Sequence, residues 1–191
     1  MPDAPYQPVV VMPDGRKFVR VTGALRAAGV IPTMHGATDY HADRGTAVHK
    51  TIELAIKGTL DESSVHPDVA PFLASWRKFN EATESYWLQT EVEVVSYDDG
   101  FCGRIDAIAR INGIPTLIDF KTGGHAEWHR LQTALYWLGA IESNLDPMPC
   151  RRAVLYLHDD GSCATFVQHN SVLDLHRALT ALNDGKKVLL V

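Results

Sequence analysis

The chain has 191 residues, of which 46% are hydrophobic and 21% charged, the size and composition of one soluble globular domain with a sizeable core. Its net charge of −5 argues against a protein that coats nucleic acid through basic contacts, but not against an enzyme that holds phosphate through a metal ion. The three cysteines include no C-x-x-C pair, which argues against a zinc ribbon or a cysteine-ligated iron–sulfur cluster.

The sequence lacks the marks of export and of membrane insertion. Its first residues show neither a basic n-region nor an apolar h-region, and no apolar run is long enough to cross a bilayer. An odd number of cysteines without an export signal fits a reducing compartment. We therefore expect a cytoplasmic protein with no membrane partner.

Residues 9–22 show the pattern of a hairpin. Two apolar runs flank Asp14-Gly15, a dipeptide that favours a tight turn between strands. Thr22 is the expected N-cap of a short helix that follows, and residues 32–44 are predicted to form a polar loop. A small hairpin and a helix are therefore expected before the main part of the domain.

Two longer helices are predicted next. Asp43 and Gly58 are typical of the residues that begin and follow a helix, which gives a first helix over 43–58. Residues 66–85 predict a second helix, which Pro71 is expected to loosen because proline removes a backbone donor. Both helices precede a marked change of pattern.

From residue 88 onward the hydrophobic pattern alternates as in strands. The alternation over 88–121 is interrupted at Asp99-Gly100 and at Asn112-Gly113, and such dipeptides are the strongest short hairpin signals. These turns predict a three-stranded antiparallel meander. The remaining segments predict a helix, two strands and a final helix, over 127–141, 151–158, 163–169 and 171–187.

The order of these elements predicts an α/β fold. A strand–helix–strand unit follows Thr116, and such a unit pairs its strands in parallel through a right-handed crossover. Together with the antiparallel meander, this unit gives a mixed central β-sheet flanked by helices. No internal repeat or low-complexity tract divides the chain, so we expect a single domain over 1–191.

The turn at 112–113 has a consequence for charged residues. A two-residue loop fixes the register and places Asp106 opposite Asp119, with Cβ atoms roughly 4.5–5.5 Å apart. Lys121 shares the face of Asp119 because side chains alternate along a strand. Like charges directly opposite one another are destabilising, so this acidic pair calls for a partner.

The turn at 99–100 adds further acids to that face. If it is also a two-residue loop, Glu93 lies opposite Asp106, and Glu91 points to the same side. Buried charges need pairing or a metal ion, and clustered carboxylates favour a hard cation such as magnesium or manganese. The alternative is an exposed sheet face on which basic side chains neutralise the acids.

Helical spacing adds two more groups of candidate residues. Gly45, His49 and Glu53 recur every four residues, so they share one helix face, and His49 is a candidate imidazole ligand. Gln132 and Tyr136 are also four residues apart and are candidates for contact with a phosphate or a base. The alternatives are a polar surface histidine and a half-exposed amphipathic helix.

Taken together, these residues resemble the PD-(D/E)XK nuclease superfamily and, within it, the RecB-like exonuclease branch. The pattern of that branch is a helical G-x-x-x-H, a strand acid, G-x-x-D, D-x-K and Q-x-x-x-Y. Its five parts occur in order here, as Gly45 to His49, Glu91 or Glu93, Gly103 to Asp106, Asp119 to Lys121 and Gln132 to Tyr136.

The resemblance implies a restriction-endonuclease-like αβββαβ core over about 43–157 and hydrolysis of DNA phosphodiester bonds with Mg²⁺ or Mn²⁺. Asp106, Asp119, the Phe120 carbonyl and His49 would hold the metal, and Lys121 would orient or deprotonate the attacking water. The strand acid stays open at this stage. The family pattern favours Glu91 and the register count favours Glu93, and a β-bulge would reconcile them.

The resemblance also implies partners and a setting. No helicase domain and no iron–sulfur cysteines are present, so the chain looks like a phage-type recombination exonuclease in a bacterial or phage-infected cell. Its implied partners are DNA and either a helicase or a single-strand annealing or binding protein. The alternatives are a sequence- or structure-specific endonuclease and a catalytically decayed DNA-binding module on the same fold.

Overall fold

The computed structural model describes residues 7–32 and 39–191. Within these residues seven strands form one sheet in the order β1-β2-β4-β5-β6-β7, with β3 paired to β4. The strands are β1 Val9–Val11, β2 Lys17–Arg20, β3 Ser85–Ser96, β4 Phe101–Ile111, β5 Ile114–Lys121, β6 Arg151–Tyr156 and β7 Thr165–Gln168. The helices are α1 Val21–Ala27, α2 Asp39–Ile56, α3 Ala70–Ala82, α4 Glu127–Glu142 and α5 Val172–Leu189, with a short 3₁₀ turn, η1 Glu62–Ser64.

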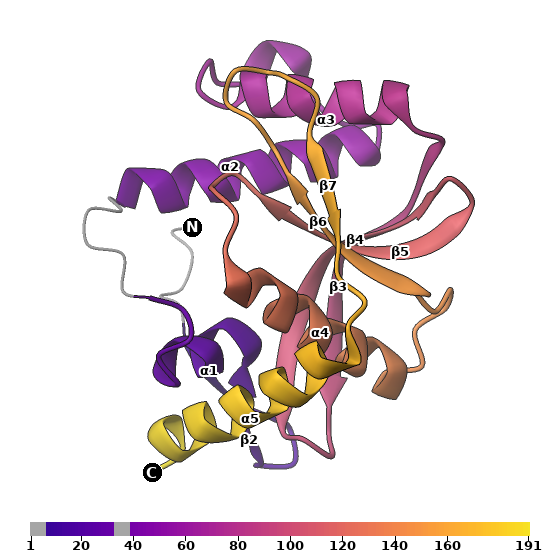
Figure 1. Cartoon of the computed structure of the whole chain (residues 1–191). Coiled ribbons are helices and arrows are strands. Elements are labelled where there is room, and N and C mark those ends of the chain that lie inside the picture. Colours follow the sequence, from indigo (N-terminus) through magenta and orange to yellow (C-terminus); the bar gives the residue numbers. More distant parts are fainter. Residues whose placement is uncertain (1–6, 33–38) are drawn as a thin grey trace.

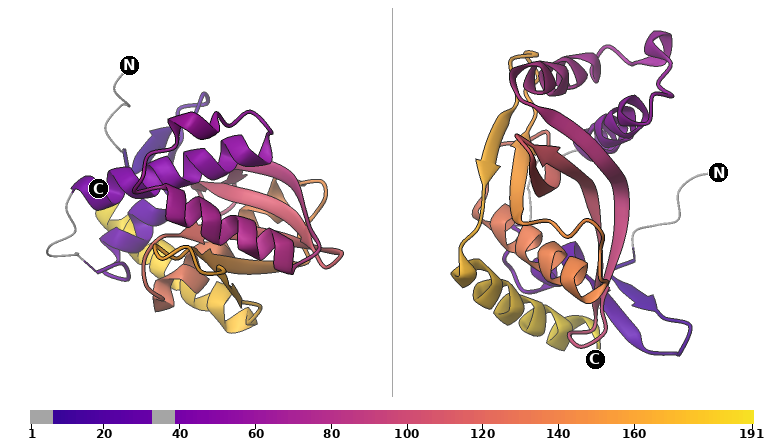
Figure 2. Two further views of the ribbon diagram at one scale, coloured as in Figure 1. Left: turned by 90° about the horizontal axis from the view of Figure 1, so that it is seen from above. Right: turned by 90° about the vertical axis from the view of Figure 1, so that its right-hand side faces the viewer.

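Helices cover both faces of this sheet, which gives two hydrophobic cores (Figures 1 and 2). One core joins the sheet to α1, α4 and α5 and contains Leu25, Leu135 and Leu182. The other joins it to α2 and α3 and contains Ile52 and Phe72. The expected α/β architecture, a mixed sheet flanked by helices, is therefore confirmed. No helix of the described residues is long and apolar enough to span a membrane.

The N-terminal predictions are confirmed in type but shifted in position. β1 and β2 form the expected antiparallel hairpin. The helix after it begins at Val21 with Arg20 as its N-cap, so the prediction of Thr22 as N-cap is wrong. Of the predicted polar loop, residues 33–38 lie outside the described residues, and α2 already begins at Asp39. Pro71 lies in the first turn of α3, where a missing backbone donor costs nothing.

The strand predictions around the meander are confirmed. β3, β4 and β5 pair antiparallel in sequence order, and β6 pairs parallel with β5 after the intervening helix α4. The turn at 112–113 gives the predicted register, because Ile111 pairs with Ile114 and Ala107 with Ile118. The same count places Asp106 and Asp119 across from one another just beyond the last pair.

Beyond that pair, β4 and β5 separate. β5 pairs with β4 only up to Ile118 and then continues beside β6, where Lys121 pairs with Tyr156. Along the same edge of β4, pairing resumes only at Cys102 and Phe101, with β2. The sheet therefore forks over residues 103–106 of β4, and the predicted catalytic acids lie at the base of this fork.

Candidate active site

Asp106 connects three elements at the fork. One carboxylate oxygen, Oδ2, accepts the backbone N–H of Phe120 at 2.7 Å, so the carboxylate takes a place that a ladder partner would have in a regular strand pair. The other oxygen, Oδ1, lies 3.4 Å from Nδ1 of His49, which α2 carries across the sheet. The His49 ring also meets the Phe120 ring edge to face, with centroids 5.9 Å apart. The structure therefore brings His49 and Asp106 together.

Asp119 and Lys121 form the second pair of the site. Nζ of Lys121 lies 2.6 Å from Oδ2 of Asp119, as expected for side chains two residues apart on one strand. Asp119 is only 1% exposed, whereas part of the Lys121 side chain reaches the surface. The opposite face of this segment is packed by Ile118 and Phe120. An ion pair is thus held inside the sheet at its fork.

The two acids differ in protonation. Burial raises the pKa of Asp119 to about 6, and repulsion from Asp106 adds to this, while the Lys121 ammonium opposes it. Burial also works against a charge on Asp106, but His49, Lys121 and the Phe120 N–H outweigh it and lower its pKa. For His49, attraction to Asp106 outweighs burial, and its pKa is raised. Two neighbouring carboxyl groups with separated pKa values are typical of acid–base sites.

The strand acid is Glu91 by geometry. Ser96 pairs with Phe101, so the hairpin loop has four residues, 97–100, and the register predicted from a two-residue loop is wrong. Glu93 pairs with Arg104, and the same count brings Glu91 opposite Asp106. The side chain of Glu91 is 30% exposed and that of Glu93 is 76% exposed. Burial raises the pKa of Glu91, with repulsion from Asp106 as the next cause.

Glu91 also has an unusual backbone. Its φ is +53°, in the left-handed region that a non-glycine residue inside a strand rarely adopts. Such conformations cost on the order of 1–3 kcal/mol and tend to occur at functional sites. The fold therefore accepts strain at the one residue of β3 whose carboxylate faces Asp106.

Gln132 and Tyr136 come together, but inside the protein. Nε2 of Gln132 donates to the Tyr136 hydroxyl at 2.8 Å, and the two residues are 4% and 6% exposed. The Tyr136 ring lies against Gly103, where an added Cβ would come within 2.6 Å of Cε1. At Gly45, by contrast, an added Cβ would make an ordinary contact of 3.7 Å with Thr122 Oγ1. Contact of this pair with nucleic acid stays a prediction.

A cleft of about 560 Å³ opens between α2 and the β3–β4 hairpin. Its walls are Thr46, His49, Lys50, Glu53, Glu91, Glu93, Arg104 and Asp106. Two of these groups are themselves ion-paired. Glu53 is nearly buried and lies between Lys50 and Lys57 at 2.8 and 2.5 Å, a spacing of three and four residues that the sequence does show. Arg104 donates to both Glu91 and Glu93, which only the register reveals.

Aromatic residues surround Lys121 on its other side. Nζ of Lys121 lies 5.5 Å from the centre of the Trp128 ring, and the buried His129 bonds the hydroxyl of Tyr156 at 2.8 Å. Within the described residues, no three His, Cys, Asp or Glu side chains are already arranged as ligands of a metal ion. Asp106 and Asp119 are instead neutralised by His49 and Lys121.

Comparison with solved structures supports the fold. A protein described as a "putative exonuclease" from Eubacterium rectale has a TM-score of 0.59 at 11% identity, over 91% of this chain and 80% of that chain. SSO0001 has a TM-score of 0.44 at 19% identity, over 89% and 75%. LHK-Exo in complex with dAMP has a TM-score of 0.41 at 14% identity, over 87% and 86%. No protein-family model and no curated protein matches the sequence.

Proposed function

We propose that this chain is a divalent-metal-dependent deoxyribonuclease that hydrolyses phosphodiester bonds from a DNA end. The observation that carries the proposal is the fork of β4 and β5, where Asp106 and Asp119 meet Lys121 and His49. Two acids with separated pKa values, a lysine and an imidazole are groups that phosphodiester hydrolysis can use. The fold shared with the E. rectale protein, which is described as a "putative exonuclease", agrees with this assignment.

The donor set fits a hard divalent cation. Asp106, Asp119 and Glu91 supply carboxylate oxygens, the Phe120 carbonyl is the further oxygen proposed, and His49 adds a nitrogen that manganese accepts more readily than magnesium. Loading such a site requires the pairs with Lys121 and His49 to open. A bound cation would neutralise charge at the scissile phosphate and lower the pKa of a water.

The protein groups then have distinct tasks. The Lys121 ammonium, once released from Asp119, orients the attacking water and offsets negative charge on the phosphate. Before a cation is bound, Asp106 keeps His49 at the site, with Oδ1 3.4 Å from Nδ1. Water adds to phosphorus and the bond to the 3′ oxygen breaks, so the products are a 5′-phosphate and a 3′-hydroxyl.

A digestion experiment tests this proposal. End-labelled linear DNA and covalently closed circular DNA of the same sequence, each single- and double-stranded, are incubated with the protein and Mn²⁺ or Mg²⁺. An exonuclease shortens the linear molecules and leaves the circles intact. Cleavage of circles would replace the exonuclease by an endonuclease, and no cleavage of any DNA would leave a binding module on the same fold.

Matched variants separate the chemistry from the fold. Asp119→Asn should abolish cleavage, and Glu93→Gln should retain it, because Glu93 pairs with Arg104 and not with Asp106 in the observed register. Lys121→Ala should also stop turnover yet still bind Mn²⁺ in a calorimetric titration. Cleavage at the wild-type rate by Asp119→Asn would overturn the proposed site.

A further inference from the structure

The Lys121 ammonium is held from two sides. On one side is the Asp119 carboxylate, 2.6 Å away. On the other is the face of Trp128, whose ring centre lies 5.5 Å from Nζ, within the range of a cation–π interaction. Trp128 belongs to the first turn of α4, so two different elements fix the position of one charged atom.

Three further rings, those of His125, His129 and Tyr156, form a wall beside Trp128. The ring of His129 meets it edge to face, with centroids 4.0 Å apart. His129 bonds the Tyr156 hydroxyl, and Tyr156 is the partner of Lys121 in the β5–β6 register. His125 stacks on Tyr156 with centroids 3.7 Å apart. The wall therefore connects the first turn of α4 to the strand beside Lys121.

The ring of this wall that meets Trp128 is neutral. Burial, with the nearby Lys121 ammonium as the next cause, lowers the pKa of His129 to about 3. His129 is thus neutral wherever the protein is folded and active, and it leaves the ammonium as the cation on this side of the site. An aromatic face is a suitable support for an ammonium group.

The proposed function makes this second contact necessary. Asp119 cannot hold both the Lys121 ammonium and a divalent cation at one oxygen, because two positive charges would then be adjacent. An ammonium released from Asp119 with no second partner would be free to turn into solvent, since a lysine side chain has many rotamers. The Trp128 face is already in contact and lies beside the site.

We propose that Trp128 is a positioning residue that keeps Lys121 directed at the reacting phosphate when Asp119 is engaged by a cation. This inference rests on the proposed nuclease function. The alternative role for this aromatic side chain is stacking on unpaired bases. A stacking residue acts on substrate binding, whereas a positioning residue acts on turnover.

The kinetic test compares Trp128→Phe with Trp128→Leu. Phenylalanine keeps an aromatic face and leucine removes it while remaining apolar. We expect kcat to fall roughly 2- to 30-fold in Trp128→Leu, with KM nearly unchanged, and Trp128→Phe to recover most of the loss. A rise in KM at unchanged kcat would assign Trp128 to the substrate instead, and equal losses in both variants would reduce it to a packing residue.

A second readout needs no DNA. In protein labelled at lysine, the ε-methylene of Lys121 should show an upfield ring-current shift, assigned by its absence in Lys121→Arg. The shift should persist on addition of Mg²⁺ and vanish in Trp128→Leu. Its loss on Mg²⁺ addition to wild type would overturn the inference. Absence of any wild-type cleavage would instead overturn the nuclease function itself, so the two failures are distinguishable.

Discussion

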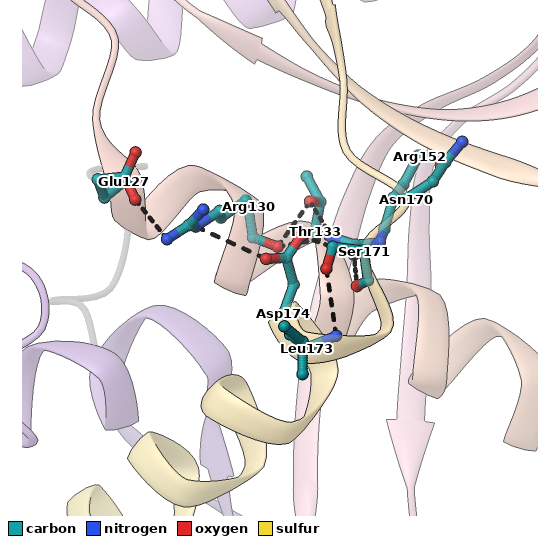
Figure 3. Close-up of polar contacts among 8 residues, drawn as sticks. All are labelled: Glu127, Arg130, Thr133, Arg152, Asn170, Ser171, Leu173 and Asp174. Carbon is teal, nitrogen blue, oxygen red and sulfur yellow. Dashed lines mark hydrogen bonds and ion pairs between the residues drawn. The ribbon is translucent and has the colours of Figure 1, made fainter.

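Two buried ion pairs in this molecule are built in opposite ways. Arg152 and Asp174 meet between β6 and α5, with many further partners (Figure 3). Lys121 and Asp119 meet at the sheet fork. There the buried Asp119 carboxylate contacts one ammonium, at 2.6 Å. The first pair connects β6 to α5, and in the proposed function the second exchanges its lysine for a cation.

The Arg152 guanidinium donates four hydrogen bonds. The guanidinium donates to two backbone carbonyls and two side chains, namely Arg130 O at 2.7 Å, Ser171 O at 2.9 Å, Asp174 Oδ2 at 3.0 Å and Thr133 Oγ1 at 3.3 Å. Ser171 also caps α5 by accepting the Leu173 N–H. Planar guanidinium groups suit such multiple contacts better than an ammonium does.

The comparison shows that burial alone does not tell a structural charge from a functional one. Around Arg152, both terminal nitrogens of the guanidinium have acceptors, so removing the guanidinium would take a partner from the buried Asp174 carboxylate. Around Asp119, the carboxyl group keeps a pKa of about 6 despite its lysine, which means that the protein holds its charge at a cost. Substitutions at the two pairs and at the neighbouring site residues should separate these two behaviours, with the largest effect at Arg152.

Arg152→Met should lower the free energy of unfolding by up to about 3–5 kcal/mol, because it leaves the buried Asp174 carboxylate with only the longer contact to Arg130, at 3.6 Å. Urea unfolding monitored by circular dichroism measures the change. Arg177→Met, at an exposed position on α5, is the matched control and should stay within about 0.5 kcal/mol of wild type. A similar small loss for both variants would show that the network does not stabilise the fold.

Asp119→Asn should stabilise the metal-free protein as pH rises. The folded-state pKa of about 6 lies above the ordinary 3.8, so the folded protein binds this proton more tightly than the unfolded chain. Wild type then loses stability between about pH 4 and pH 7, on the order of 3 kcal/mol for the full shift, and the variant does not.

The measurement is urea unfolding of both proteins in EDTA across this pH range. Asp184→Asn, at an exposed site on α5, should follow the wild-type curve throughout. If the difference between Asp119→Asn and wild type stayed constant with pH, the carboxyl group would not be held at a raised pKa.

Glu91→Gly should separate stability from activity. Glycine adopts a φ of +53° without strain, so the variant should gain about 1 kcal/mol or at least lose nothing, while cleavage falls. Glu93→Gly is the matched control, because glycine in a regular strand position is destabilising by roughly 0.5–1 kcal/mol. Thermal unfolding measures the stability of both variants, and the digestion assay measures their cleavage. Equal destabilisation of both variants would show that the backbone of Glu91 is not strained.

His49→Ala should change the choice of metal more than the stability. Removing the imidazole leaves oxygen ligands only, so activity with Mn²⁺ should fall more than activity with Mg²⁺. The exposed His176→Ala variant on α5 is the control. Activity across a concentration series of each metal checks this prediction, and parallel losses with both metals would remove His49 from the set of ligands.

Most of the fold could be predicted, because its elements have local patterns. The turn at 112–113 fixed one register correctly, since its loop does have two residues. The turn at 99–100 gave a wrong register, because Asp-Gly also ends longer loops. The loop has four residues, so Glu91 and not Glu93 lies opposite Asp106. An Asp-Gly dipeptide alone does not show how many residues belong to the loop.

The parts of the site that escaped prediction depend on distant partners. Arg104 lies on β4 and meets both glutamates of β3 only because of the register. Trp128 comes to Lys121 through the docking of α4, and the sequence gives no sign of that distance. Tyr136 was expected near a ligand, yet it is packed against Gly103. Helical spacing shows which residues share a face but not how deeply that face is buried.

The fork of the sheet also sets the order in which the site is assembled. The meander can form early from contacts between neighbouring segments, but the part of β5 that carries Asp119 and Lys121 pairs with β6 instead. Such non-local parallel pairing is slow to form. A chain still emerging from the ribosome therefore has its acids and its lysine without a sheet to hold them until β6 has been made. The same topology that positions these groups delays their chemistry until β6 has been synthesised and has paired with β5.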